Sequence, residues 1–180
     1  FNTYLQDLGR FMNAALRLSW YKFKHHYMDF VKVLLGIVAF EGLILYIQDK
    51  GFLKDFETTR MTLFLLLFST SLLIVVQNSI YISKERSVLN RDFFSGLSRS
   101  AFALASMGIH AFFAVLETIV FILSYSVFSK FFDKEFPDAG HIFGSYRWEV
   151  GITVLLVFLA SHFIALFISA LVGKSEITSV

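Results

Sequence analysis

Three polar side chains recur at seven-residue intervals within one long apolar stretch of the sequence: His110, Glu117 and Ser124. Seven residues make nearly two helical turns, so these three share one stripe of a helix. Because an ionisable side chain that faces lipid costs several kcal/mol, we expect the stripe to face protein or water. Two interpretations stay open. The stripe is a polar relay or substrate-contacting surface, or Glu117 is a packing residue bonded to His110 or His162.

A second polar stripe runs through the segment 61–82. Thr70 and Gln77 are seven residues apart, as are Ser71 and Asn78. Hydroxyl and amide side chains at such positions either bond to neighbouring helices or line a hydrated path. We therefore expect Thr70, Gln77 and Asn78 to face a hydrated path, with interhelical bonding as the equal alternative.

The residues needed for several other kinds of chemistry are missing or wrongly spaced. The chain has no cysteine, which excludes disulfides, zinc-thiolate sites and cysteine nucleophiles. Gly173, Lys174 and Ser175 resemble the end of a phosphate-binding loop, but the first glycine of that loop would fall at Ile168. No His-Glu-x-x-His pair is present. We expect no catalytic residue, no metal site and no cofactor within this chain.

The elements that position both stripes are four apolar runs. Of the 180 residues 56% are hydrophobic, and the mean hydropathy is +0.65. A bilayer core needs about 20 helical residues for one crossing, and runs of this length are too long for barrel strands. The sequence predicts an all-α, polytopic helical membrane domain over residues 1–180. Its predicted spans are 30–47, 61–82, 101–128 and 150–172.

Basic residues are distributed unequally between the two sides that four crossings define. The side with both chain ends and the loop 83–100 carries ten Lys and Arg residues, and the opposite side carries six. The positive-inside rule therefore predicts that the N-terminus and the C-terminal end are cytoplasmic. The net charge of +2 excludes a dominant nucleic-acid-binding patch, so membrane lipids are the expected surroundings.

The residues 4–27, which precede the first span, have an amphipathic pattern. Arg10, Arg17 and Lys24 recur at heptad spacing, whereas Leu5, Leu8 and other apolar residues fall mainly on the other side. This pattern predicts a helix that lies in the cytoplasmic interface of the membrane. The alternative is a surface helix that packs on a soluble domain.

The most specific stretch of sequence is the loop 84–98 that follows the second span. Its characteristic residues are Glu85, Arg86, Val88, Arg91, Asp92, Ser95, Gly96 and Ser98, and Ala101 and Phe102 follow. This pattern resembles the loop after the second transmembrane helix in type-2 ABC exporter permeases, above all the G subfamily of the White type. Asp92 stands where that pattern usually has glutamate. The segments Leu8-Gly9-Arg10 and 167–176 are similar to the connecting helix and to the end of the fourth helix of that family.

The resemblance implies a short cytoplasmic coupling helix between the second and third spans. In that family this helix rests against an ATP-binding domain, so Glu85, Arg86, Arg91 and Asp92 would pass nucleotide-driven motion to the spans. Their mixed charges also suit ion pairs with a soluble partner.

The resemblance also implies partners and a function. ATP and Mg would bind to an associated ATP-binding domain, in the same or another chain, and two transmembrane domains would form a homodimer or heterodimer. The chain would then be a permease domain, incomplete at its C-terminal end, that exports a lipophilic or amphipathic substrate by alternating access.

Two functions of other classes stay open on the residues alone. One is a non-transporting membrane scaffold or assembly subunit, in which the polar stripes only hold helices together. The other is an intramembrane enzyme that uses Glu117 with His110 or His162. ATPase activity that a lipophilic compound stimulates favours the exporter, and a chelator-sensitive metal favours the enzyme.

Overall fold

The computed structural model describes residues 2–48, 55–79, 81–82, 89–90, 94, 96, 98–133, 142 and 144–171, without the side chains of residues 2–12 and a few others early in the chain. Four long helices make up this part: α1 (Asn2–Ile47), α2 (Phe56–Asn78), α4 (Arg99–Phe131) and α5 (Tyr146–Leu171). The described residues contain no strand, and each helix holds a segment long and apolar enough to cross a membrane. The predicted all-α membrane fold with four spans is confirmed.

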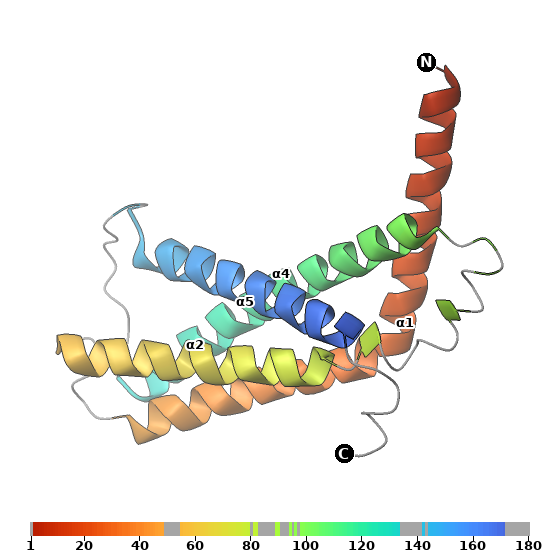
Figure 1. Ribbon diagram of the computed structural model, residues 1–180. Helices are drawn as coiled ribbons and strands as arrows, with labels where there is room; N and C mark the ends of the chain where they lie inside the picture. The colour runs from red at the N-terminus through yellow and green to blue at the C-terminus, as the bar shows by residue number, and fades with distance from the viewer. Residues whose placement is uncertain are drawn as a thin grey trace, which may run out of the picture.

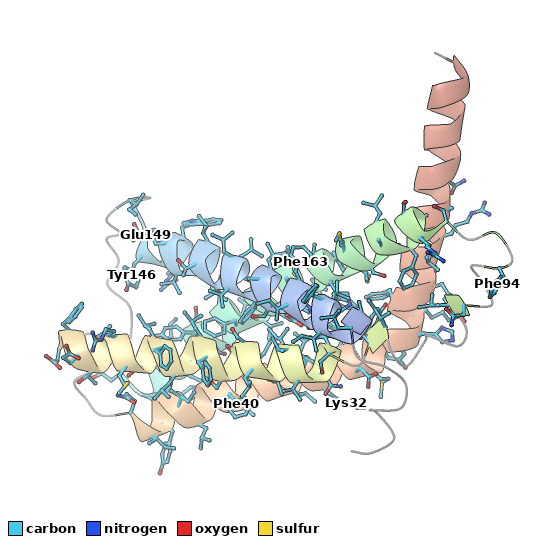
Figure 2. All side chains as sticks on the ribbon, in the orientation of Figure 1. Lys32, Phe40, Phe94, Tyr146, Glu149 and Phe163 are labelled. Atoms are coloured by element: carbon cyan, nitrogen blue, oxygen red, sulfur yellow. The ribbon has the colours of Figure 1, made fainter. Side chains whose placement is uncertain are left out.

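Consecutive helices run in opposite directions along the bundle (Figure 1). We call one end of the bundle proximal and the other distal. The proximal end holds Lys32, Asn78, Arg99 and Leu171, and the distal end holds Ile47, Phe56, Phe131 and Tyr146. Figure 2 labels Lys32 and Phe94 near the proximal end and Tyr146 and Glu149 at the distal end. Both α1 and α5 pack against α2 and α4.

The helix α1 continues through both of the ranges that the sequence assigns to an interfacial helix and to the first span. The residues that join these ranges, Met28 and Asp29, include neither proline nor glycine, so nothing in the local sequence breaks the helix. Its apolar segment is Tyr27–Ile47. We call the part of α1 before this segment, residues 2–26, the N-terminal limb. In Figure 1 it runs across the direction of the spans and projects away from them.

The surface and the interior of the bundle have the polarity expected in lipid rather than in water. Large apolar side chains cover the outside, among them Leu35, Leu123 and Phe167, each more than 60% exposed. The interior combines apolar side chains such as Ile37 and Phe158 with a set of buried polar residues. That set comprises Glu41, Thr62, Thr70, Ser106, His110, Glu117, Thr118, Ser129, Ser161, His162 and Ser169. Small and polar residues between helices are typical of membrane bundles.

The helix α2 begins five residues before the predicted start of the second span, Met61. The side chain of Asp55 accepts a hydrogen bond from the backbone N–H of Thr58 and so caps the helix. Glu57 and Arg60 add an exposed ion pair in the first turn. A capped polar turn therefore precedes the apolar run, and a count of apolar residues alone omits it.

A close approach between α1 and α4 provides a test of this packing. A Cβ atom at Gly42 would lie 3.1 Å from the ring of Phe128, whereas a Cβ atom at Gly108 would meet nothing within 4 Å. Overpacking of a helix contact costs about 1–3 kcal/mol. We expect Gly42→Leu to be less stable than Gly108→Leu by about that amount in thermal unfolding of the purified protein. Equal midpoints for the two variants would contradict the close contact.

Candidate functional site

Three buried polar side chains join α4 to α5 in a continuous hydrogen-bonded network. His110 Nδ1 lies 3.0 Å from His162 Nδ1, and His162 Nε2 lies 2.8 Å from Glu117 Oε2. The three side chains are at most 1% exposed. We call this set the α4–α5 polar network. The imidazole of His162 uses both of its nitrogens to bridge two residues of the other helix.

The α4–α5 polar network is complete in two proton arrangements. In the first, Glu117 is a carboxylate that accepts from His162 Nε2–H, and His162 Nδ1 accepts from His110 Nδ1–H. In the second, Glu117 carries a proton and donates to His162 Nε2, and His162 Nδ1–H donates to His110 Nδ1. Each arrangement satisfies both bonds. The two interconvert by two proton shifts when His110 Nε2 carries a proton in both, so that His110 is an imidazolium in the first arrangement and neutral in the second.

The proximal end of the network meets the residues that lead into the loop 84–98. The rings of Tyr81 and His110 form an edge-on contact with centroids 4.7 Å apart. The backbone N–H of Ile82 donates to Ser169 Oγ of α5 across 2.7 Å. Tyr81 and Ile82, which precede this loop in the chain, therefore contact both α4 and α5.

A second buried contact joins α1 to α4. The hydroxyl of Ser124 donates to Glu41 Oε2 and also lies 2.9 Å from the backbone carbonyl of Val120. Glu41 is fully buried. Thus His110, Glu117 and Ser124, which the sequence places on one stripe, face two different helices. The first two residues meet α5, whereas Ser124 meets α1.

The predicted path-lining residues of α2 have mainly local roles in the structure. Thr70 is fully buried, and its hydroxyl donates to the carbonyl of Leu66 across 2.6 Å. The amide of Asn78 donates to the carbonyl of Ile74 across 2.9 Å, and Gln77 is half-buried. The structure thus places two of these polar groups in hydrogen bonds within their own helix.

The four predicted coupling residues, Glu85, Arg86, Arg91 and Asp92, lie outside the described residues. Within the described residues, no group of three or more His, Asp or Glu side chains is arranged to hold a metal ion. In the α4–α5 polar network, both nitrogens of His162 already bond to protein atoms. The arrangement can transfer a proton and hold two helices together.

Sequence reasoning missed Tyr81 and Ser169 as members of this region. Ser169 follows His162 by seven residues, so the spacing that singles out the stripe of α4 also marks this pair on α5. Tyr81 carries no comparable signal, because its role depends on how the chain leaves α2 and reaches His110. Aromatic residues are common at such helix ends for other reasons.

Residues 14–180 match the family model described as ABC-2 type transporter. No curated protein and no solved structure matches the chain.

Proposed function

The chain belongs to the ABC-2 type transporter family, and we propose that it is the permease of an exporter that moves a lipophilic or amphipathic molecule. Family membership and four apolar helices identify it as the membrane domain of an ABC transporter that partners an ATP-binding domain. Export, the class of substrate and alternating access are parts of our proposal.

The contacts of Tyr81 and Ile82 carry this proposal. Only Ser83 separates these residues from the loop 84–98, and they contact His110 of α4 and Ser169 of α5. A force applied to the loop by an ATP-binding domain would therefore reach both helices of the α4–α5 polar network. Glu85, Arg86, Arg91 and Asp92 are the proposed contacts with that domain, which would bind ATP and Mg.

The arrangement of the helices supports the proposed orientation in the membrane. The proximal end adjoins the loop 84–98 and the N-terminal limb of α1, so the basic side predicted to be cytoplasmic is the proximal one. The limb crosses the direction of the spans, as a helix in the membrane interface would (Figure 1). We propose that the proximal end faces the ATP-binding domain.

Alternating access requires two packings of the spans that nucleotide binding selects. The helix α2 contributes Leu66 and Ile74 to the apolar core, but its large apolar side chains on the opposite face, among them Phe64 and Phe68, are exposed and free of contacts that would restrict a second packing. We propose that α2 takes part in a path between two transmembrane domains, with Gln77 and Asn78 near it.

Transport by the full-length protein, including its ATP-binding domain, tests the proposal. In inside-out vesicles we expect ATP-dependent accumulation of a lipophilic fluorescent probe such as rhodamine 123 or a fluorescent phosphatidylcholine. The variant Gln77→Leu should reduce the rate of accumulation several-fold and leave basal ATP hydrolysis unchanged. Val76→Leu is the matched control, because it changes the neighbouring residue of the same helix to leucine without removing a polar group.

Two results would overturn parts of this proposal. If probes of several chemical classes neither accumulate in the vesicles nor stimulate ATP hydrolysis, the chain is better explained as a membrane scaffold. If accumulation is normal in both variants, Gln77 does not lie on the path.

A further inference from the structure

A cavity of about 300 Å³ opens at the distal end between α2, α4 and α5. Its walls are mostly apolar and include Leu63 and Leu67 of α2, Phe121 of α4 and Val154 of α5. From Tyr146 to Val154 the lining extends roughly 12 Å along α5, at the helical rise of about 1.5 Å per residue. Ligand pockets in proteins typically measure about 300–1,000 Å³. This cavity therefore has room for one hydrocarbon chain.

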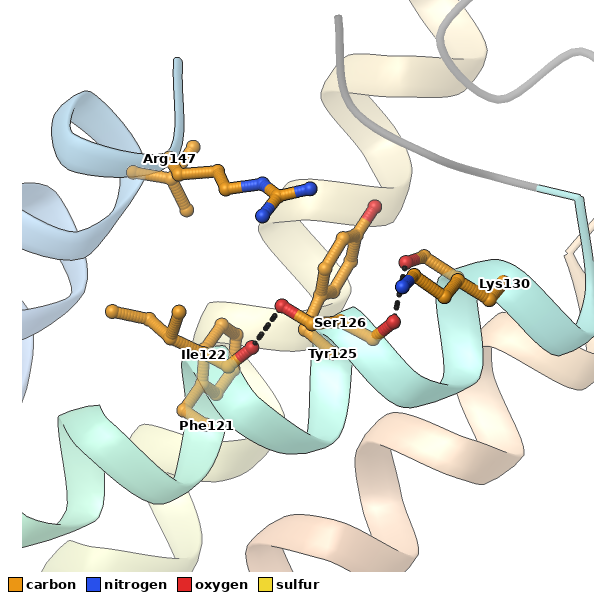
Figure 3. Close-up of a pocket in the computed structure, with 8 residues that line it drawn as sticks. Phe121, Ile122, Tyr125, Ser126, Lys130 and Arg147 are labelled. Atoms are coloured by element: carbon orange, nitrogen blue, oxygen red, sulfur yellow. Dashed lines mark hydrogen bonds between the residues drawn. The ribbon is translucent and has the colours of Figure 1, made fainter. Parts of the chain in front are cut away.

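A polar notch of about 20 Å³ lies beside the cavity, between α4 and α5. Phe121, Tyr125 and Val150 line both spaces. Two cationic side chains, Lys130 and Arg147, line only the notch, and in Figure 3 they extend toward Tyr125 from α4 and α5. A space of this size holds about one water-sized group, so the notch has room for one oxygen atom of a headgroup. The other atoms of the headgroup would lie at the membrane surface.

The charges around these two spaces are unequal. Neither Lys130 nor Arg147 forms an ion pair with another described residue, and the described lining of the notch includes no carboxylate. Glu149 lines the cavity instead, and its carboxylate accepts from the backbone N–H of Ile142. An anion is therefore favoured in the notch and disfavoured in the cavity, whereas a hydrocarbon chain is favoured in the cavity.

We infer that the distal ends of α2, α4 and α5 form a binding site for a single-chain anionic amphiphile. The chain occupies the apolar cavity, and a phosphate or carboxylate group contacts Lys130 and Arg147 at the membrane surface. Tyr125, which lies between the two spaces, fixes the point where the chain ends and the charged group begins. This site lies within one chain and does not depend on the transport that we propose above.

Equilibrium binding to the full-length protein in phosphatidylcholine nanodiscs tests the site. The probe is radiolabelled dodecyl phosphate. We expect saturable binding that dodecanoate displaces and that dodecylphosphocholine and dodecyltrimethylammonium displace at least tenfold less effectively. Phosphatidic acid added to the discs distinguishes a bilayer lipid from a free amphiphile. Because the cavity accommodates one chain, phosphatidic acid should displace the probe poorly.

Two pairs of variants separate the charged part of the site from the apolar part. We expect the double variant Lys130→Gln/Arg147→Gln to bind dodecyl phosphate about tenfold more weakly. Arg60→Gln, which removes a positive charge at the same end outside the site, should bind within twofold of the unmodified protein. Thr153→Phe projects an aromatic ring into the cavity and should reduce binding to a similar extent. Ile152→Phe, at the neighbouring residue outside the cavity lining, is its control.

The inference is overturned if binding of dodecyl phosphate is not saturable, or if the zwitterionic and anionic amphiphiles compete equally. It is also overturned if the double variant binds like the Arg60→Gln control. Displacement by phosphatidic acid as effective as that by dodecanoate would show that a two-chain lipid occupies the site, contrary to the single-chain assignment. Because Lys130, Arg147, Thr153 and Ile152 all have exposed side chains, these substitutions should leave folding intact.

Discussion

Replacement of His162 with leucine is expected to lower the free energy of unfolding by about 3 kcal/mol. Both nitrogens of His162 bond to α4, one to His110 and one to Glu117. Leucine leaves the carboxyl group of Glu117, which is 1% exposed, without its imidazole partner. The loss of one partner from a buried pair costs more than the pair itself contributes, because the remaining group keeps its full desolvation cost.

A double variant distinguishes this explanation from a simple packing defect. Double-mutant cycles give a hydrogen bond between membrane helices a net contribution of about 0.6 kcal/mol on average and about 1.7 kcal/mol at most. We therefore expect Glu117→Leu/His162→Leu to be about 1–2 kcal/mol more stable than His162→Leu, because both variants remove the bond to His110 but only the single variant also leaves the Glu117 carboxyl group without its partner. Phe163→Leu, at the neighbouring exposed position, is the control for the substitution. Reversible unfolding in mixed detergent micelles gives the free energy of unfolding of all three variants. Equal losses for the single and double variants would show that Glu117 does not depend on His162.

The variant Arg91→Glu is expected to lose the stimulation of ATP hydrolysis by lipophilic compounds. The increase in the ATPase rate that such a compound causes should fall at least tenfold. The resemblance of the loop 84–98 to a coupling helix places Arg91 against the ATP-binding domain, where a reversed charge would replace an attraction with a repulsion. The affinity for ATP should be unchanged, because ATP would bind to the ATP-binding domain and not to this loop. ATPase assays on the full-length protein with and without a lipophilic compound measure this effect.

The control for Arg91→Glu is Lys32→Glu. Lys32 is also at the proximal end, but its side chain is 65% exposed on α1 and pairs with Asp29 one helical turn away. Its charge reversal should preserve the stimulated ATPase activity. If Arg91→Glu and Lys32→Glu are both fully stimulated, the loop 84–98 has no coupling role. If both lose the stimulation, the effect comes from the charge of the proximal surface and not from the loop.

The number of spans could be read from the sequence because length and hydropathy are local properties. A segment such as 101–128 has more apolar residues than one crossing needs, and lipid compels its backbone to bond internally as a helix. Helix ends were less predictable. The start of α2 depends on a hydrogen bond from Thr58 to Asp55, and the continuity of α1 across Met28 and Asp29 has no sequence signal beyond the absence of proline and glycine there.

The candidate site shows where this local reasoning stops. Seven-residue spacing places His110, Glu117 and Ser124 on one stripe, and the high cost of a carboxylate in lipid turns that stripe inward. Both conclusions follow from the sequence of one helix. Spacing within a helix says nothing about which neighbour covers each part of a stripe.

The sequence by itself therefore determined which four segments span as helices, which residues of α4 form one inward polar stripe and how the basic residues are divided between the two ends. Only the tertiary structure decided that α5 covers Glu117 while α1 covers Ser124, that Tyr81 reaches His110, and that Lys130 and Arg147 border one notch. The reason is physical. Periodicity results from the geometry of a single backbone, whereas the partners of a side chain result from how long helices cross, and that crossing depends on contacts between residues far apart in the chain.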